Sequence, residues 1–183
     1  MSVPFLIAGV GLVAVQRLLE LRLSRRHERS LRARGAVERG RGHYPWMVGV
    51  HVLWLISTLV EGLLRGPSIP SWWPVPLALF LLAQLLRYWV ILSLGEYWST
   101  RVLVVPGTTL VRRGPYRYLR HPNYVVVAVE IATFPLIFGA WVTALIFSIL
   151  NAALLFVRIR TENRALAELA VSKYPRPTNR SAE

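Results

Sequence analysis

A polar segment at 106–124, PGTTLVRRGPYRYLRHPNY, lies between two long apolar runs and carries residue types that could bind a small ligand. It ends in Arg120-His121-Pro122-Asn123-Tyr124. Proline fixes φ and lacks an N–H, so Pro122 suits the first turn of a helix and holds His121 extended just before it. The free N–H groups and the positive dipole end at such a helix start favour an anionic group, such as the carboxylate of a small ligand.

A second set of charged residues follows the last apolar run, as Arg158-Ile159-Arg160-Thr161-Glu162-Asn163-Arg164. Arg158 and Glu162 are four residues apart, so on a helix they share one face, at a depth where a lipid headgroup or a soluble cofactor could reach them. Each segment alone has a plain structural explanation, as a helix start with a solvent-facing His and as a basic membrane anchor with a surface salt bridge. Only the two together, joined by a hairpin, indicate a binding site.

Composition and charge place these residues in a membrane protein. The 183-residue chain is 54% hydrophobic with a mean hydropathy of +0.43, and its apolar residues fall in long blocks. The formal charge of +13 lies on no soluble module with a basic face, so it indicates membrane orientation and not nucleic-acid binding. There is no Cys, no Asp and one Lys, Lys173, which excludes thiolate chemistry, a catalytic Asp and a Schiff-base Lys.

The apolar segments predict an all-α membrane protein with five transmembrane helices in a single domain over 1–183. The first three spans are expected at about 3–21, 44–64 and 73–94. The apolar run at 125–157 would make one helix of about 50 Å against a hydrocarbon core of about 30 Å. Pro135 and the following Phe138-Gly139-Ala140 offer a turn, so we expect a helical hairpin of two short spans, at about 123–138 and 141–158.

The arginines predict which ends of the spans face the cytoplasm. Loops 22–43 and 95–122 and the tail 159–183 are rich in Arg, so they are expected to be cytoplasmic, with the N-terminus outside. The first half of loop 22–43 can form a surface helix, and Leu166 and Leu169 predict a short interfacial helix after the last span. The hairpin then brings the polar segment and the charged end of the last span to one membrane face.

Ionisable residues inside the spans are site candidates by default, because they usually face a bundle interior. His51 and Glu61 lie three helical turns apart, about 15 Å, which is too far for one acid–base pair. Arg87 either extends to the cytosolic interface or faces the oxygen of a substrate. Arg17 and Glu20 share a helix face near one membrane surface and are expected to form an interfacial ion pair.

The run GPYRYLRHPNY, followed by a helical hairpin and RIRTENRAL, resembles the isoprenylcysteine carboxyl methyltransferase family of integral membrane methyltransferases, in particular its small five-span bacterial members. The resemblance covers at least 98–169. The N-terminal stretches QRLLELRLSRR, RGAVERG and HYPWMVGVH also resemble the branch encoded beside type III polyketide synthases. Members of that branch are thought to methylate alkylresorcinol or alkylpyrone lipids.

The resemblance implies methyl transfer from S-adenosyl-L-methionine at the cytosolic face of the membrane, here a bacterial inner membrane. It implies that Glu162 binds the cofactor and that Arg158 or Arg160 binds the acceptor. The sequence departs from the family pattern where Glu162-Asn163 replaces a common pair of Glu, and where Arg101 replaces an amide of the eukaryotic relatives. The implied cofactor-binding residues are Arg101, Thr108, Thr109, Leu110, Val111, Tyr116, His121, Pro122, Asn123, Tyr124 and Glu162.

These residue types suit the cofactor. The helix start with His121 can take the methionine carboxylate, Tyr116 or Tyr124 can cover the adenine, and Glu162 can accept hydrogen bonds from ribose hydroxyls. The sulfonium makes the methyl electrophilic, so the protein mainly has to align nucleophile, methyl and sulfur, and no metal is required.

The acceptor is expected to be lipophilic, with an apolar tail between the spans and an oxygen at the cytosolic mouth. A carboxylate needs only Arg158, Arg160 or Arg87 to position it, whereas a phenol or hydroxypyrone must lose a proton to a base such as His51, Glu130 or Glu162. The expected catalytic set is Arg158, Glu162 and His51. Isoprenylcysteine carboxyl methylation, N-methylation of an amine lipid and a non-catalytic membrane scaffold are the alternatives, and the sequence gives no oligomeric state.

Overall fold

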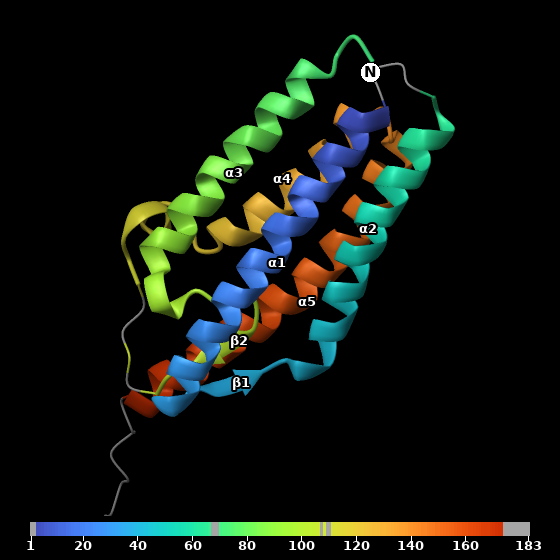
Figure 1. The fold of residues 1–183 in the computed structure, drawn as a ribbon. Coiled ribbons are helices and arrows are strands. Elements are labelled where there is room, and N and C mark those ends of the chain that lie inside the picture. The colour runs from blue at the N-terminus through green and yellow to red at the C-terminus, as the bar shows by residue number, and fades with distance from the viewer. Residues whose placement is uncertain (1–2, 67–69, 107, 109–110, 174–183) are drawn as a thin grey trace, which may run out of the picture.

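The computed structural model describes residues 3–66, 70–106, 108 and 111–173. Five α-helices lie side by side as a bundle (Figure 1). They are α1 (Val3–Ala33), α2 (Tyr44–Leu64), α3 (Pro74–Leu94), α4 (Pro122–Ile137) and α5 (Trp141–Lys173). The prediction of a helical protein with five helices is confirmed, and the last two form the expected hairpin. Its turn lies at Phe138–Ala140, where Gly139 has a φ of 73° and the Ala140 N–H donates to the Pro135 carbonyl.

Helices α1 and α5 are longer than the spans expected from the sequence. Residues 22–33, which were expected to be a loop with at most a separate surface helix, continue α1 without a break. This stretch is rich in Arg and Leu, which are good helix formers, and contains no Gly or Pro, so the first residue that favours a stop is Gly35 with a φ of 81°. The short helix expected around Leu166 is likewise the continuation of α5.

A two-stranded antiparallel sheet joins the segments expected as loops 22–43 and 95–122, on the charged side of the bundle. Strand β1 (Val37–Arg39) pairs with β2 (Val102–Val104), with Val37 opposite Val104. Glu38, on β1, accepts hydrogen bonds from Arg32 and Arg101. Burial alone would raise the pKa of Glu38, but these two guanidinium groups hold it below its usual value. The sequence did not predict this sheet, because each strand has three residues and no readable alternation.

Four of the helical segments are long and apolar enough to cross a membrane, at Val3–Ala33, Arg41–Leu64, Pro74–Tyr97 and Trp141–Ala167. Helix α4 has 16 residues, about 24 Å, which is shorter than a hydrocarbon core of about 30 Å. It packs against α3 and α5 in the interior of the bundle, and nine of its side chains are buried. The structure therefore supports four long spans plus one short, central helix.

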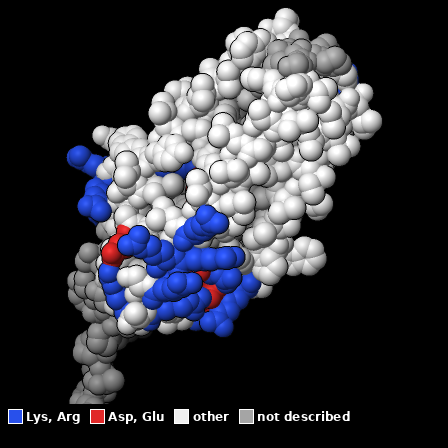
Figure 2. Space-filling view, in the orientation of Figure 1, with Lys and Arg blue, Asp and Glu red and all other residues white. Residues whose placement is uncertain are grey.

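The apolar core is built around α4. Phe134 contacts the rings of Trp54, Phe80 and Phe138 at centroid distances of 5.2–5.4 Å. Trp54 also donates from Nε1 to the Ile131 carbonyl at 3.1 Å. Charged side chains gather mostly at the other end of the molecule, over the C-terminal part of α1 and β1, and leave the longer part of this face without charge (Figure 2). The core thus holds the helices side by side, and most of the exposed charge lies at one end.

Candidate functional site

Two hollows meet at the charged end of the bundle. The first, the polar pocket, has a volume of about 100 Å³ and lies between the start of α4, the later part of α5 and the segment that precedes β2. The hairpin brings α4 and α5 together here, as the sequence predicted for these two segments. The wall of the polar pocket includes six of the residues expected to bind a cofactor, namely Arg101, Tyr116, His121, Asn123, Tyr124 and Glu162.

The second hollow, the apolar cleft, has a volume of about 480 Å³ and lies among α1, α2, α4 and α5. Most of its wall is made of Leu, Val and Ile side chains. Three of them, Leu18, Val52 and Ile56, are also more than half exposed on the apolar surface of the bundle. The cleft therefore opens on the side of the protein that faces lipid.

The two hollows share part of their walls. The five residues that line both are Trp98, Ser99, Asn123, Tyr124 and Arg158, and we call this shared wall the junction. A molecule in the apolar cleft and a molecule in the polar pocket would meet there. The arrangement suits a reaction between a lipophilic and a water-soluble reactant.

Arg158 is fixed at the junction by three contacts. Its Nε donates to the Tyr124 hydroxyl at 3.0 Å and its Nη2 to the Thr100 carbonyl at 2.7 Å, and its Nη1 lies 2.8 Å from the Met47 sulfur. The Tyr124 hydroxyl in turn donates to the Glu162 carboxylate. Because Arg158 and Glu162 are on one face of α5, as their spacing predicted, Tyr124 links a cation beside the cleft to a carboxylate in the polar pocket.

His121 completes this group on the side of the polar pocket. Its ring stacks on Tyr124 at 5.3 Å, its Nε2 lies 3.2 Å from Asn163 Oδ1, and its Nδ1 lies 3.7 Å from Glu162 Oε1. The Glu162 carboxylate is the main cause that raises the pKa of His121, and partial burial opposes it. Burial raises the pKa of the Tyr116 hydroxyl, which therefore stays neutral beside Glu162.

Two buried polar atoms at the junction have no hydrogen-bond partner in the described part of the chain. They are Trp98 Nε1, a donor, and Asn123 Oδ1, an acceptor. Buried polar groups are nearly always paired in native proteins, so each of these atoms calls for a partner from outside the chain, such as water or a ligand. Asn123 was among the residues expected to bind the cofactor, whereas Trp98 was not.

Arg101 lines the polar pocket, but its guanidinium is engaged with the protein. It donates to Glu38, lies 3.4 Å from Glu28, and covers the Tyr44 ring at 4.1 Å. The guanidinium thereby links β1, β2 and the start of α2. In this structure Arg101 positions the wall of the pocket, and its expected role in cofactor binding stays a prediction.

Among the described residues expected to bind the cofactor, Thr108, Val111 and Pro122 line neither hollow. Thr108 donates from its hydroxyl to the Val105 carbonyl at 2.8 Å, which fixes a turn, and Val111 lines neither hollow. Thr109 and Leu110 are outside the described residues. Pro122 is buried in the first turn of α4, as predicted. Arg160 is exposed and stacks on the Phe156 ring at 4.0 Å, whereas the other two candidate acceptor-binding arginines, Arg158 and Arg87, line the apolar cleft.

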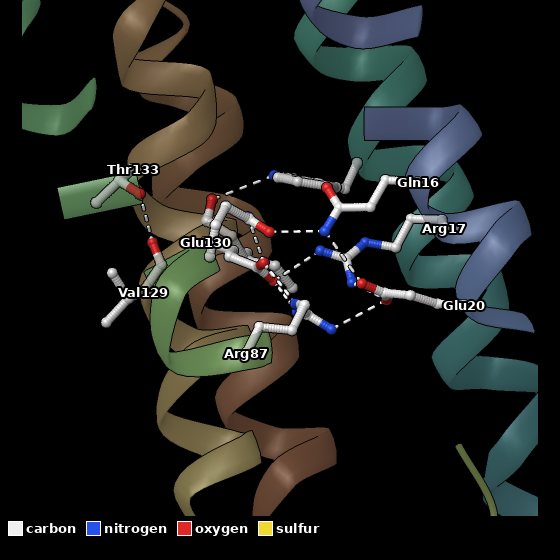
Figure 3. A network of polar contacts seen from close by, with 10 residues as sticks. Gln16, Arg17, Glu20, Arg87, Val129, Glu130 and Thr133 are labelled. Carbon is white, nitrogen blue, oxygen red and sulfur yellow. Dashed lines mark hydrogen bonds and ion pairs between the residues drawn. The ribbon is translucent and has the colours of Figure 1, made fainter. Parts of the chain in front are cut away.

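The ionisable residues inside the spans form a buried charge cluster that the sequence did not predict as a unit (Figure 3). Glu130 accepts from Arg17 at 2.8 Å and from Arg87, and Glu20 accepts from Arg17 at 2.6 Å and from Arg87 at 3.1 Å. Gln84 donates to Glu130 at 2.6 Å. Two cations offset two anions, and three helices, α1, α3 and α4, are joined by the contacts.

This cluster corrects the expectation that Arg87 could extend to the cytosolic interface. Arg87 is 3% exposed and is held by Glu20 and Glu130, because its position on α3 faces the bundle interior. Arg17 and Glu20 form the expected ion pair, but within this larger cluster. Glu130, a candidate base, is fully engaged by cations.

His51 lines the apolar cleft and does not contact the junction directly. Its Nδ1 lies 2.8 Å from the carbonyl of Met47, which is one helical turn earlier on α2. The sulfur of the same Met47 contacts Arg158. Glu61 has a different role, because its carboxylate accepts from the backbone N–H groups of Val142 and Thr143 at 3.1 and 2.7 Å. Glu61 thus caps the start of α5.

The fold and these hollows define a class of protein, a helical membrane bundle in which an apolar cleft meets a polar pocket. The family follows from comparison with known proteins. The model of the isoprenylcysteine carboxyl methyltransferase (ICMT) family matches residues 76–168, so the chain belongs to this family of membrane methyltransferases. The resemblance stated from the sequence is confirmed.

Two relatives are similar over most of the chain. The uncharacterized protein YpbQ of Bacillus subtilis (strain 168) is 45% identical over 162 residues, which are 88% of this chain and 96% of the relative. An uncharacterized protein of Haemophilus influenzae (strain ATCC 51907 / DSM 11121 / KW20 / Rd) is 29% identical over 154 residues, 84% of this chain and 90% of the relative. No solved structure matches the chain.

Proposed function

We propose that the protein transfers the methyl group of S-adenosyl-L-methionine to an oxygen of a lipophilic acceptor at the cytosolic face of a bacterial inner membrane. The observation that carries the proposal is the junction, where an apolar cleft open to lipid and a polar pocket at the charged end share one wall. The ICMT family match supports methyl transfer as the reaction. The arginine-rich end of the molecule supports the cytosolic orientation.

The residues of the polar pocket fit the cofactor's functional groups. Trp98 Nε1 is an unpaired buried donor that can bind a carboxylate, and Asn123 Oδ1 is an unpaired acceptor for a hydroxyl or ammonium group. The second carboxylate oxygen of Glu162, Oε1, accepts no hydrogen bond from Tyr124 and lies 3.7 Å from His121 Nδ1, and Tyr116 offers an aromatic face. When bound, the cofactor supplies an electrophilic methyl group.

The size of the pocket limits how the cofactor is held. A volume of about 100 Å³ is below the 300 Å³ or so at which pockets for whole drug-sized ligands begin. A pocket of this size would hold only part of the cofactor. The part of the cofactor held by the polar pocket would be the part next to the junction.

Arg158 favours an oxygen acceptor over an amine. Its guanidinium is held at the junction, so an anionic oxygen in the apolar cleft gains a cationic partner there. The same cation repels the ammonium form of an amine lipid. A carboxylate is positioned directly, and a phenol or hydroxypyrone is favoured in its anionic form by the nearby positive charge.

For a phenolic acceptor, such as the alkylresorcinol and alkylpyrone lipids of the branch that the N-terminal half resembles, a base must take the proton. His51 is four residues beyond Met47 on α2, about 6 Å deeper in the cleft than the contact between Met47 and Arg158. Its Nδ1 donates to a backbone carbonyl, so Nε2 is free to accept. Glu162 is the alternative base on the other side of the junction.

The test is binding of S-adenosyl-L-methionine to the purified protein in detergent, for the native chain and for Glu162→Gln. We expect the variant to bind at least about tenfold more weakly, because an acceptor of charge-assisted hydrogen bonds is lost. The matched control is Glu96→Gln, since Glu96 is exposed and lies in neither hollow. Equal binding by native and Glu162→Gln would place the cofactor elsewhere, and no binding by the folded native chain would favour a scaffold.

A further inference from the structure

The apolar cleft contains a polar side chain that the protein itself does not satisfy. Asn151, on α5, lines the cleft and is 2% exposed. In the part of the chain that the structure describes, its amide has no hydrogen-bond partner. Unpaired polar groups are costly inside a membrane protein and mark functional positions, so Asn151 calls for a partner from outside the chain.

A second unpaired polar atom faces the same cleft from α2. His51 Nδ1 lies 2.8 Å from the Met47 carbonyl, which can only accept, so Nδ1 carries the proton. The ring is then a neutral tautomer whose Nε2 is an acceptor, and Nε2 contacts no donor among the described residues. The cleft therefore offers one acceptor atom at His51, Nε2. At Asn151 it offers the N–H donors and the oxygen acceptor of the side-chain amide.

Both residues lie deeper in the membrane than the junction. Helices α2 and α5 are antiparallel, because Met47 touches Arg158 near one end and Glu61 caps α5 at the other. From the contact between Met47 and Arg158, His51 is four residues along α2 and Asn151 is seven residues along α5, which is about 6 and about 10 Å. Both residues therefore line the part of the cleft below the junction.

The other polar groups of the cleft are not available in this way. Arg17, Glu20 and Arg87 also line it, but each is engaged in the buried charge cluster. The rest of the wall at this depth is Leu, Val and Ile. Arg17 keeps one unpaired donor, Nε, but its charge is already offset by Glu20 and Glu130. Among the described residues below the junction, His51 and Asn151 are thus the uncharged groups that can select a ligand by hydrogen bonding.

We propose that the acceptor carries a second polar group, a hydroxyl, which is bound by His51 and Asn151 deeper in the cleft than the oxygen that is methylated. A hydroxyl matches the two sites, because it donates to His51 Nε2 and accepts from the Asn151 amide. This inference rests on the proposed function and narrows its substrate class to lipophilic acceptors with two oxygen groups. Because His51 Nε2 is then occupied by the second hydroxyl, Glu162 is the base for a phenolic oxygen at the junction. A purely apolar tail would leave Asn151 unpaired, and sites of this kind reject such analogues strongly.

The test compares three probes. They are meta-pentadecylphenol, pentadecylresorcinol, which adds a hydroxyl to the ring, and a pentadecylphenol with a hydroxyl on its chain close to the ring. Binding to the purified protein in detergent is measured without cofactor, and initial methyl-transfer rates follow with S-adenosyl-L-methionine. We expect the native protein to bind at least one dihydroxy probe about tenfold more tightly than the monohydroxy probe.

The variant Asn151→Leu, which is close in size, should bind all probes alike. Thr58→Val is the matched control, because Thr58 is fully buried on α2, donates to the Trp54 carbonyl and does not line the cleft. The control should keep the native preference. If Asn151→Leu does not fold, His51→Leu is expected to reduce the same preference in the cofactor-free assay.

Equal binding of all three probes by the native protein would overturn the inference, as would a preference that survives in both Asn151→Leu and His51→Leu. Failure of the proposed function has a different signature. It would appear as no S-adenosyl-L-methionine binding and no transfer to any probe, while cofactor-free binding of the probes still reports on the second site.

Discussion

The Tyr124 hydroxyl connects the two charged groups of the site. It accepts a hydrogen bond from Arg158 and donates one to Glu162, and its ring also supports His121. Because a carboxylate can only accept and a guanidinium can only donate, a hydroxyl is the group that can link them in this order. We expect both the geometry of the site and the stability of the fold to depend on this one oxygen.

Tyr124→Phe should lower the free energy of unfolding by about 1–3 kcal/mol, because Arg158 and Glu162 each lose a partner while partly or fully buried. Methyl transfer should fall by about tenfold or more, since the cation at the junction is no longer held in place. Denaturation in detergent and initial rates check the two effects. Tyr118→Phe, at an exposed tyrosine, is the control, and a Tyr124→Phe variant that matches it in both assays would refute this role.

His121 predicts a pH dependence. Its folded pKa is raised above its ordinary value of 6.5 by Glu162, so the pairing stabilises the fold at acidic pH and is lost as the pH rises through the folded pKa. The native protein should therefore lose more stability than His121→Gln between about pH 5.5 and about pH 8.5, by no more than about 1 kcal/mol for a partly exposed pair. Parallel pH profiles of the two proteins would show that the pairing contributes nothing.

At the residue scale, the sequence predicted which side chains gather, and it could not predict how each is used. The spacing of Arg158 and Glu162 and the helix start at Pro122 follow from local rules, and the structure places them in one site. Arg101 illustrates the limit, because its pairing with Glu38 depends on the contact between β1 and β2. No local pattern in either segment signals that contact.

At the scale of elements, helix α5 depends on a cap supplied by another helix. Glu61 of α2 accepts the first free N–H groups of α5, from Val142 and Thr143, and also pairs with Arg65. A helix start leaves several N–H groups unsatisfied, and a carboxylate there pairs with them and with the positive dipole end. The contact fixes the end of the hairpin that is far from the site.

Glu61→Gln should destabilise the protein by about 1–2 kcal/mol, because the neutral amide keeps one acceptor oxygen and loses the charge. Thermal unfolding in detergent measures this. Glu96→Gln removes an exposed pair with Arg34 and should change stability little. A Glu61→Gln protein as stable as Glu96→Gln would mean that α5 does not need this cap. Cofactor binding should be largely retained, since Glu61 lies in neither hollow.

Elements with a strong periodic or apolar signal were predictable, and those that depend on partners were not. The hairpin followed from the length of the apolar run and from Pro135, and it is present. The ends of α1 were missed because charge was taken as the end of a helix, whereas the helix needs a residue such as Gly35 to stop it. The three-residue strands are stabilised by pairing with each other, which a sequence read locally does not show.

At the scale of the whole molecule, the buried charge cluster decides how α1 is held against α3 and α4. The charges of its two arginines and two glutamates sum to zero. Four hydrogen bonds between them have donor–acceptor distances of 2.6–3.1 Å. Buried ion pairs add little net stability over apolar residues, but removing one partner leaves an uncompensated charge. We therefore expect the cluster to specify how α1 packs against α3 and α4 more than to add stability.

Glu130→Leu should destabilise the protein by about 3–5 kcal/mol, because Arg17 and Arg87 lose their shared anion. The double variant Glu130→Leu with Arg87→Met restores charge balance, since Arg17 keeps Glu20, and should recover much of the loss. Unfolding in detergent and the yield of inserted protein measure both. Equal stability of the single and double variants would show that charge balance in this cluster is unimportant.

The global arrangement was predictable from hydropathy as a helical membrane bundle, but the cleft was not. The residues of its wall, such as Leu18 and Ile56, look like any lipid-facing side chain in the sequence. A hollow arises from how far apart whole helices stand, which is set by packing elsewhere, including the aromatic core around Phe134. Asn151 was visible only as a polar interruption of an apolar run.

The opening of the cleft between Leu18, Val52 and Ile56 determines which concentration of the acceptor sets the reaction rate. An acceptor that enters there stays in the bilayer, so its effective concentration is its mole fraction among the lipids. The relevant concentration of the cofactor is its concentration in the aqueous phase. Diluting the acceptor with inert lipid then slows the reaction even when the total amount in the vessel is unchanged. Under the proposed function, an increase in membrane area at a constant amount of acceptor should therefore lower the rate.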